Sequence, residues 1–231
     1  MFNFLRNKPA PQPLPRNNRV GSAWWLHQTE QKYGGCQSGV KRNKVSPVDP
    51  RSKRAIESGG MIGGDRMSPE HHGYAPFYEK HLAPFIGKPV ILAEVGILRG
   101  HGLAMWSELF PEGQILGYDI DLGHFESTEP DLRSRGAFQN SNPELHEFDQ
   151  LLGHPENVAR TLNGRKLDIV IDDGLHNEQS IRNTWRCFSP LLADKFVYII
   201  EDNAKAHKFM RFDVQGRTIA NEGEISAIFS A

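Results

Sequence analysis

The sequence predicts a doubly wound α/β domain with a mostly parallel, seven-stranded sheet, a C-terminal antiparallel hairpin and an irregular N-terminal arm. From residue 74 onward, short apolar runs alternate with amphipathic stretches, a pattern typical of βα units joined by right-handed crossovers. The preceding residues are instead rich in Pro, Asn, Arg, Gly and Ser, which indicates loops. We therefore expect an arm over residues 1–62 and a domain over residues 63–231.

The expected elements follow in chain order. In the arm, residues 1–20 are expected to be mobile and residues 23–33 to form a short helix. In the domain, five apolar runs predict buried strands and four amphipathic stretches predict helices. Two final segments are expected to pair as a hairpin around residues 221–223. The strands are expected at 90–95, 114–120, 144–148, 167–171 and 195–200, the helices at 78–85, 102–110, 155–162 and from 177, and the hairpin at 210–219 and 224–230.

Charge is divided unequally along the chain. Residues 1–60 carry 11 Lys/Arg against 3 Asp/Glu, a net charge of +8, while the remainder carries 16 against 25, a net charge of −9. Three interpretations of the basic arm stay open: a solvated tail, an arm folded over the acidic body, or an arm that meets an anionic acceptor such as a nucleotide-linked sugar. No nucleic-acid partner is expected, because the basic residues are not interleaved with a recognisable binding motif.

The composition also bears on location. No apolar run approaches the ~20 residues of a membrane span, and the first residues lack the apolar core of a secretory signal. The two cysteines, Cys36 and Cys187, are far apart in the sequence, which argues against a disulfide framework. We therefore expect a cytoplasmic protein without membrane association.

Acidic side chains follow two of the expected strands at the point where each ends. Residues 168–176 read Asp-Ile-Val-Ile-Asp-Asp-Gly-Leu-His, and Glu201-Asp202 follows the next strand. Neighbouring parallel strands end at the same edge of a sheet, about 4.8 Å apart. Carboxylates that close repel one another unless a cation lies among them, so the sequence predicts a metal site. The alternative is that Asp172 or Asp173 simply caps the following helix.

The first strand of the domain leads into a glycine-containing turn. Glycine at such a turn lets the backbone approach a ligand, but Gly96, Gly100 and Gly102 do not match the G-x-G-x-x-G dinucleotide pattern. Glu94 would repel a pyrophosphate, whereas it suits the ammonium and sulfonium of S-adenosylmethionine. Asp119, at the end of the second strand, can accept hydrogen bonds from ribose hydroxyls. These residues favour S-adenosylmethionine as the cofactor.

Four motifs carry a family resemblance: Glu-x-Gly-x-x-x-Gly at 94–100, Gly-Tyr-Asp-Ile-Asp at 117–121, Asp-Asp-Gly-Leu-His at 172–176 and Ile-Glu-Asp-Asn at 200–203. In this order they resemble the class I S-adenosylmethionine-dependent methyltransferases, which have a Rossmann-like fold. More narrowly, the chain is similar to metal-dependent sugar O-methyltransferases that act on macrolide and related glycosides, including the rhamnosyl O-methyltransferases, and to the cephalosporin-tailoring group. The resemblance covers roughly residues 63–205 and includes the segment at 72–79.

The resemblance implies a cofactor site with the methionine end at the first strand, the ribose at the second and the adenine near the third. Phe148 stands where the family has a glycine, which alters the contact expected near the adenine. Asp172 points to the face opposite Asp173, where it would contact the cofactor or cap a helix. The residues expected to contact the cofactor are Glu94, Gly96, Gly100, Asp119, Asp149, Gln150 and Asp172.

The resemblance further implies a metal-assisted reaction. Asp173, Glu201 and Asp202 would bind the ion, and His176 would act as general base. An all-oxygen ligand set without a nearby cysteine favours Mg²⁺, with Mn²⁺ or Ca²⁺ as alternatives, over Zn²⁺. A methyl group would pass from S-adenosylmethionine to a hydroxyl of a sugar or glycoside, whose metal-bound diol His176 deprotonates.

The acceptor is expected to be a small molecule, and the basic arm allows it to be anionic; the resemblance also allows a homo-oligomer. Three other functions stay open. They are a catechol-type O-methyltransferase acting on a small aromatic diol, a nicotinamide oxidoreductase, and a non-catalytic cofactor-binding protein. Activity on a glycoside but not on catechol, and binding of S-adenosylmethionine rather than NAD, would separate them.

Overall fold

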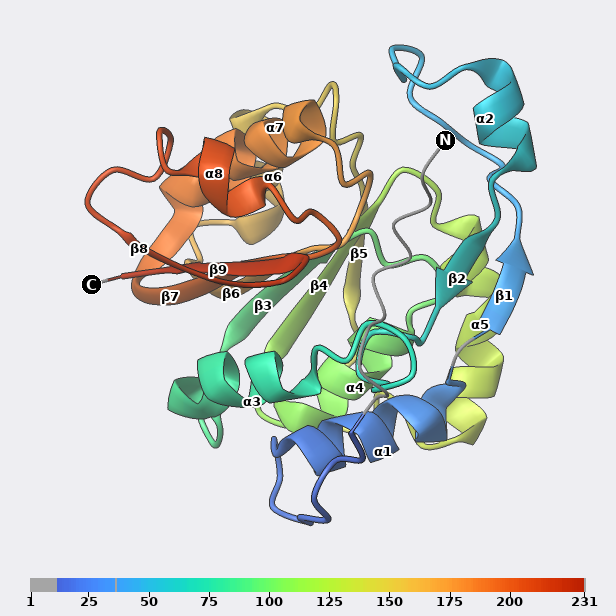
Figure 1. Ribbon diagram of the computed structural model, residues 1–231, viewed down its shortest axis with the longest axis vertical. Coiled ribbons are helices and arrows are strands. Elements are labelled where there is room, and N and C mark those ends of the chain that lie inside the picture. The colour runs from blue at the N-terminus through green and yellow to red at the C-terminus, as the bar shows by residue number, and fades with distance from the viewer. Residues whose placement is uncertain (1–11, 36, 231) are drawn as a thin grey trace, which may run out of the picture.

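The computed structural model describes residues 12–35 and 37–230. Within them, seven strands form the main sheet: β3 (Ile91–Val95), β4 (Gln114–Asp119), β5 (Glu144–Glu147), β6 (Leu167–Asp172), β7 (Leu192–Ile200), β8 (Thr218–Glu222) and β9 (Ile225–Phe229). Their order across the sheet is β5-β4-β3-β6-β7-β9-β8 (Figure 1). The first five pair in parallel, and β9 is antiparallel to both of its neighbours. The predicted α/β sheet with its C-terminal hairpin is confirmed.

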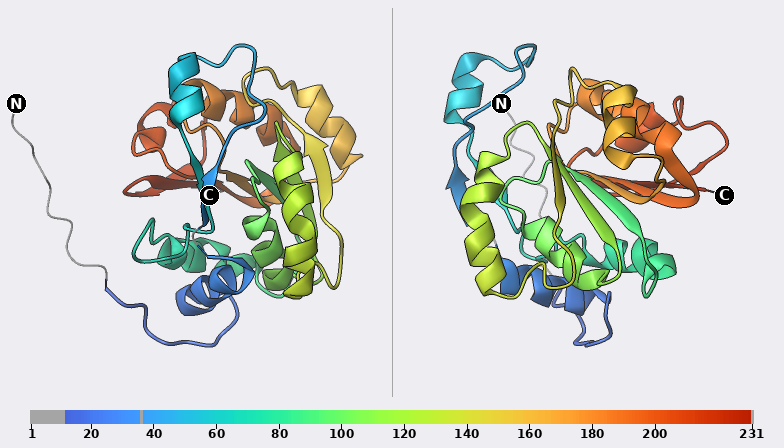
Figure 2. Two further views of the ribbon diagram at one scale, coloured as in Figure 1. Left: turned by 90° about the vertical axis from the view of Figure 1, so that its right-hand side faces the viewer. Right: turned by 180° about the vertical axis from the view of Figure 1, so that it is seen from behind.

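Helices cover both faces of this sheet, as Figures 1 and 2 show. One face carries α1 (Ala23–Tyr33), α3 (Ala75–Leu82), α4 (His101–Leu109) and α5 (Gly123–Ser134), and the other carries α6 (Pro155–Leu162), α7 (Glu178–Phe188) and α8 (Ala206–Met210). Successive side chains along a strand point to opposite faces of the sheet, so each strand contributes residues to two cores. On β3, for example, Leu92 packs in the core of the first face and Ala93 in the core of the second, and both are fully buried.

The arm adds a small second sheet. β1 (Gln37–Val40) pairs antiparallel with β2 (Met61–Gly63), and α2 (Lys53–Ser58) lies between them in sequence. Figures 1 and 2 show these strands beside α5. The link between β1 and α2 reaches the end of β5, where Lys44 Nζ pairs with Glu147 Oε2 at 2.9 Å. The arm therefore extends to the edge of the main sheet at which its parallel strands end.

The start of the arm is attached through α1. The Ser22 hydroxyl caps this helix by accepting the Trp25 amide, and Arg19 forms an ion pair with Glu79 on α3. Leu26 and Tyr33 of α1 are fully buried in the first core. Residues 1–11, which belong to the segment expected to be mobile, lie outside the described residues. The division of the chain at residues 62 and 63 stays a prediction.

The C-terminal segment corrects one expectation from the sequence. Residues 210–219 were expected to form a strand, but α8 ends at Met210 and β8 begins only at Thr218. Met210 and Val214 are four residues apart and both buried, a spacing that suits a helical turn better than a strand. Both residues are buried in the second core, Met210 at the end of α8 and Val214 in the turn that follows it.

Two other regions contain elements that the sequence did not suggest. Residues 34–70 were expected to be loops, but they contain β1, α2 and β2. α5 was also missed, because only Phe125 and Leu132 of its residues are buried and Pro130 lies inside it. Parallel pairing of β4 with β5 requires a crossover connection, usually a helix, and this requirement could have indicated α5. No helix in the described part of the chain combines the length and apolar character that a membrane span needs.

Candidate functional site

A cavity of about 430 Å³ lies at the carboxyl ends of the parallel strands, where ligands bind in open α/β sheets. The main domain contributes the residues that follow β3, β4, β5, β6 and β7. The arm contributes the segments on either side of α2, so it forms part of the wall rather than a separate body. The main contributing segments are 94–99, 119–121, 148–151, 173–176 and 201–202 from the domain, 42–46 and 60–62 from the arm, and 63–66 from the start of the domain.

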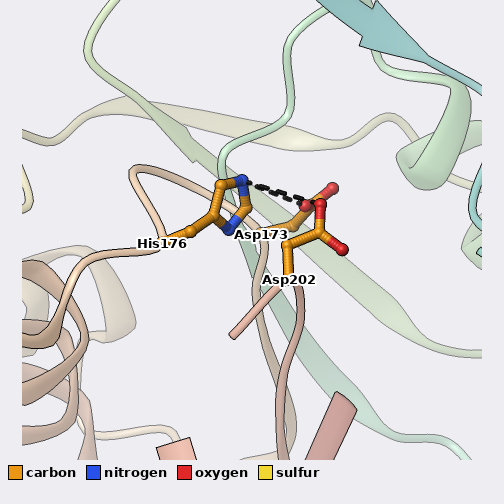
Figure 3. Close-up of side chains that lie close together, drawn as sticks. All are labelled: Asp173, His176 and Asp202. Carbon is orange, nitrogen blue, oxygen red and sulfur yellow. Dashed lines mark ion pairs between the residues drawn. The ribbon is translucent and has the colours of Figure 1, made fainter. Parts of the chain in front are cut away.

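Three of the expected site residues come together in this cavity. Asp173 follows β6, Asp202 follows β7, and His176 lies on the loop between β6 and α7. Figure 3 shows the two carboxylates and the imidazole pointing toward one another. His176 Nε2 lies 3.9 Å from Asp173 Oδ1 and 4.0 Å from Asp202 Oδ2, and one ligand atom from each residue falls within 4.8 Å of the others. These donors suit a divalent cation such as Mg²⁺ or Mn²⁺.

The backbone at this group is held in an uncommon conformation. His176 and Asp202 have positive φ angles of 60° and 55°, which cost energy for residues other than glycine. Asn203 supports both turns, because its side-chain amide donates to the carbonyl oxygen of His176 at 2.8 Å. His176 Nδ1 is buried and has no hydrogen-bond partner among the described residues. Its Nε2 is the nitrogen that faces the carboxylates.

Glycine at position 96 lets the ends of β3 and β6 approach each other. Gly96 has a φ of +90°, and a Cβ atom there would lie 2.2 Å from the carbonyl oxygen of Asp173. The Asp173 amide in turn donates to the carbonyl oxygen of Val95 at 2.8 Å. The position of Asp173 therefore depends on the turn after β3, which the sequence predicts to contact the cofactor.

The site contains a cation of its own that the sequence analysis missed. Arg66, between β2 and α3, is 8% exposed and pairs through Nη2 with Glu94 Oε1 at 2.7 Å and Asp173 Oδ2 at 2.5 Å. Its Nε donates to Glu201 Oε2 at 3.0 Å. Burial alone would lower the pKa of the guanidinium, but Glu201, Glu94 and Asp173 raise it above its usual value. The crowding of carboxylates was the only signal that could have indicated this cation.

Glu201 does not join the group of Asp173, His176 and Asp202. It is 2% exposed, and its two oxygens accept hydrogen bonds from Arg66 Nε and from the Tyr78 hydroxyl. It was expected to bind the metal, but here its carboxylate contacts Arg66, between β2 and α3, and Tyr78 on α3. Both Glu201 oxygens are thus engaged by protein donors.

Asp202 is held from the side away from His176. Its Oδ1 accepts the Tyr74 hydroxyl at 2.7 Å and lies 3.2 Å from His72 Nδ1. His72 Nε2 lies 3.3 Å from Asp65 Oδ2, so the imidazole bridges two carboxylates. The hydrogen bond that His72 donates to Asp65 raises the pKa of His72, against the effect of burial, and the charge of Asp202 raises it further. The sequence analysis gave His72 no role, although it lies in a segment that carries the family resemblance.

The cofactor half of the cavity is built around Glu94 at the end of β3. Glu94 is 1% exposed, and burial raises the pKa of its carboxyl group. Gly102 leaves room for it, because a Cβ atom there would lie 2.2 Å from Glu94 Oε1. Asp119 Oδ2 accepts the Leu98 amide at 3.0 Å, which fixes the turn that runs to Gly100 at the start of α4. Glu94, Asp119 and the turn between them thus line one wall of the cavity.

Gln150 and Asp172 form a buried pair next to this wall. Gln150 Nε2 donates to Asp172 Oδ1 at 2.6 Å, and Gln150 Oε1 accepts the Leu175 amide at 2.6 Å. Burial raises the pKa of Asp172 to about 7. Asp149 and Gln150 lie in the wall of the cavity, whereas Asp172 lies behind it, 1% exposed. Both side-chain ends of Gln150 are therefore engaged in holding the loop that carries His176.

No protein-family model matches the chain. It is 30% identical over 139 residues to mycinamicin VI 2''-O-methyltransferase of Micromonospora griseorubida, which covers 57% of this chain and 31% of that protein. It is 28% identical over 202 residues to 8-demethyl-8-alpha-L-rhamnosyl tetracenomycin-C 2'-O-methyltransferase of Streptomyces olivaceus, with coverage of 81% and 48%. The chain spans less than half the length of these relatives.

Among solved structures, the chain is similar to the MycE methyltransferase from the mycinamycin biosynthetic pathway in complex with Mg, SAH and mycinamycin VI. The TM-score is 0.56 at 21% sequence identity, over 69% of this chain and 50% of that one. The likeness establishes the fold. The predicted resemblance is confirmed: the chain has the class I methyltransferase fold, and its homologues are O-methyltransferases of macrolide and rhamnosyl-tetracenomycin compounds.

Proposed function

We propose that this protein is an S-adenosylmethionine-dependent, divalent-cation-dependent O-methyltransferase that acts on a hydroxyl group of a small-molecule glycoside. The observation that carries the proposal is the convergence of Asp173, His176 and Asp202 in the same cavity as Glu94 and Asp119. The names of the relatives support the reaction and the kind of acceptor. The structure of MycE with Mg and SAH supports the choice of ion and cofactor.

The cofactor would lie along the ends of β3 and β4. Glu94 would face its ammonium and sulfonium groups, and the turn at Gly96 and Gly100 would allow close backbone approach. Asp119 would accept hydrogen bonds from the ribose, and Asp149, with Gln150 beside it, would border the adenine. Asp172 would act from behind by holding Gln150, rather than by touching the cofactor.

Asp173 and Asp202 would bind the divalent cation, and His176 would serve as the base. When bound, the cation would lower the pKa of an acceptor hydroxyl, which is otherwise almost fully protonated at pH 7. His176 Nε2 faces the two carboxylates and would take the hydroxyl proton as the acceptor oxygen gains the methyl group. S-adenosylhomocysteine would leave, and the proton would pass from the 31%-exposed imidazole to solvent.

Glu201 would have a supporting role in this proposal. Both of its oxygens are occupied by Arg66 and Tyr78, whereas Asp173 and Asp202 each direct an oxygen toward His176. A cation held by two protein carboxylates and completed by water and acceptor oxygens is common for Mg²⁺.

We propose further that the acceptor carries an anionic group. Arg42 and Arg51 of the arm both lie in the wall of the cavity, and burial, followed by repulsion from Arg51, lowers the pKa of Arg42. Asp49 offsets part of this charge through its ion pair with Arg51. A phosphate or carboxylate on the acceptor would offset the rest. Arg42→Ala should therefore raise KM for an anionic glycoside more than KM for a neutral one.

Calorimetric titration tests the proposed function. S-adenosylmethionine and S-adenosylhomocysteine should each bind, and Glu94→Gln should weaken the former more, because only it carries the sulfonium charge. Mg²⁺ should bind to the wild-type protein and fail to bind to Asp173→Asn. Tight binding of NAD with no binding of S-adenosylmethionine would reject the proposal.

A further inference from the structure

The two carboxylate oxygens of Asp173 make different contacts. Its Oδ2 accepts a hydrogen bond at 2.5 Å from Arg66 Nη2, which belongs to the segment between β2 and α3. Its Oδ1 lies on the other side, 3.9 Å from His176 Nε2. Arg66 therefore occupies one oxygen and leaves the other directed at the imidazole.

Asp202 shows the same division of its two oxygens. Oδ1 accepts the Tyr74 hydroxyl at 2.7 Å and lies 3.2 Å from His72 Nδ1. Oδ2 is the atom that lies 4.0 Å from His176 Nε2. Thus, at both carboxylates, the oxygen near the segment between β2 and α3 is engaged, and the oxygen near His176 is left for a cation.

The three side chains that engage these oxygens come from one short segment and are themselves fixed. Arg66 is pinned by Glu94 and Glu201, and His72 is held from behind by Asp65 at 3.3 Å. Tyr74 is 6% exposed, so its hydroxyl has little freedom to move. Rigid donors of this kind restrict rotation of the carboxylates that they contact.

We infer that Arg66, His72 and Tyr74 form a clamp that orients Asp173 Oδ1 and Asp202 Oδ2 toward a divalent cation. This inference rests on the proposed function, because it takes the cation to bind at these two oxygens. Without the clamp, two neighbouring carboxylates would rotate apart to reduce their repulsion, and binding would have to restore the lost orientation. Groups that orient metal ligands in this way affect metal affinity without touching the ion.

The clearest test is the Tyr74→Phe variant, because it removes one hydroxyl and changes no charge. Calorimetric titration of the full-length Tyr74→Phe chain with Mg²⁺ should give a Kd about 10-fold higher than that of the wild-type protein. Tyr118→Phe is the matched control, since its hydroxyl bonds Thr161 on the far side of the sheet. Its Kd for Mg²⁺ should equal that of the wild-type protein.

A second pair of variants keeps the test decisive if Tyr74→Phe does not fold. His72→Ala removes the nitrogen that faces Asp202, whereas His72→Asn keeps an N–H donor close to the position of Nδ1. Mg²⁺ affinity should fall by about 10-fold in the alanine variant and recover most of that loss in the asparagine variant. A residue that acted only in folding would not show this recovery.

The outcomes separate the clamp from the proposed function. Unchanged Mg²⁺ affinity in Tyr74→Phe and His72→Ala, together with loss of binding in Asp173→Asn, would overturn the clamp and leave the cation site standing. Unchanged Mg²⁺ affinity in Asp173→Asn, or no Mg²⁺ binding by the wild-type protein, would overturn the proposed cation site and the clamp with it.

Discussion

The side-chain amide of Asn203 donates a 2.8 Å hydrogen bond to the carbonyl oxygen of His176. This bond joins the loop after β7 to the loop after β6, so His176, the proposed base, and the carboxylate of the adjacent Asp202 are held as one unit. Both His176 and Asp202 have positive φ angles, a conformation that persists only when the surroundings impose it. Asn203 is one of the groups that impose it.

Replacing Asn203 with alanine should impair catalysis more than cofactor binding. Loss of the bond would let the His176 loop relax, and a misplaced catalytic group costs on the order of 10-fold to 100-fold in rate. We expect kcat for methyl transfer to fall by that factor, while the Kd for S-adenosylhomocysteine stays within about 2-fold because its contacts are elsewhere. The control is Asn157→Ala, because the Asn157 side chain lies on α6 and accepts a hydrogen bond from exposed Arg160. An unchanged kcat in Asn203→Ala would show that the bond does not position the base.

Gly96 should tolerate no side chain. In Gly96→Ala, the added Cβ would lie 2.2 Å from the carbonyl oxygen of Asp173, so the ends of β3 and β6 would have to move apart. We expect a lower melting temperature and loss of both S-adenosylhomocysteine and Mg²⁺ binding. Gly164→Ala separates this clash from backbone strain, because Gly164 also has a positive φ, +83°, but no atom lies within 4 Å of its added Cβ. Retained binding of both ligands by Gly96→Ala would contradict the close approach.

Glu201 offers a test of the ligand assignment. Glu201→Gln removes the charge that faces Arg66, and breaking a buried ion pair costs about 3–5 kcal/mol of folding stability. We therefore expect a much lower free energy of unfolding in urea. The Kd for Mg²⁺ measured on the folded variant should change by less than about 3-fold, well below the loss expected for a ligand or its direct support. A loss of Mg²⁺ binding as large as in Asp173→Asn would instead make Glu201 a third ligand.

The stability of the protein should fall with rising pH through Glu30. Burial raises the pKa of this α1 carboxyl to about 7, above its ordinary value of 4.5, despite the opposing charge of Arg66. Between these two values the folded state binds more protons than the unfolded state, so this stabilising contribution is complete below about 4.5 and is lost as the pH passes 7. Glu30→Gln should show a smaller loss of unfolding free energy between pH 5 and pH 8 in urea titrations. Equal losses in variant and wild type would argue against the raised pKa.

Most of the sheet could be predicted from the sequence, because buried parallel strands are recognised by short apolar runs. The strands at 90–95 and 167–171 agree with β3 and β6 to within one residue at either end. Segments whose structure depends on partners far away in sequence were harder. α5 buries only Phe125 and Leu132, and the strands of the small arm sheet have three and four residues, too few to show a period.

The candidate site, too, could be predicted only in part from the sequence. Strand-end acids such as Asp173 and Asp202 could be predicted to meet, because adjacent parallel strands end at one edge of a sheet. The contribution of residues 65–74 could not, since no local pattern indicates that Arg66 lies among carboxylates from β3, β6 and β7. Only the tertiary fold, which places the segment between β2 and α3 over the strand ends, brings this charge into the site.

A methyl-transfer assay with labelled S-adenosylmethionine and a panel of glycosides, run with Mg²⁺ and with EDTA, tests the central claim most directly. We predict transfer to at least one glycoside hydroxyl with Mg²⁺, none with EDTA, and a turnover about 100-fold or more lower in His176→Ala. Cofactor binding should survive that substitution. Transfer that proceeds equally in EDTA, or equally in His176→Ala, would contradict the account.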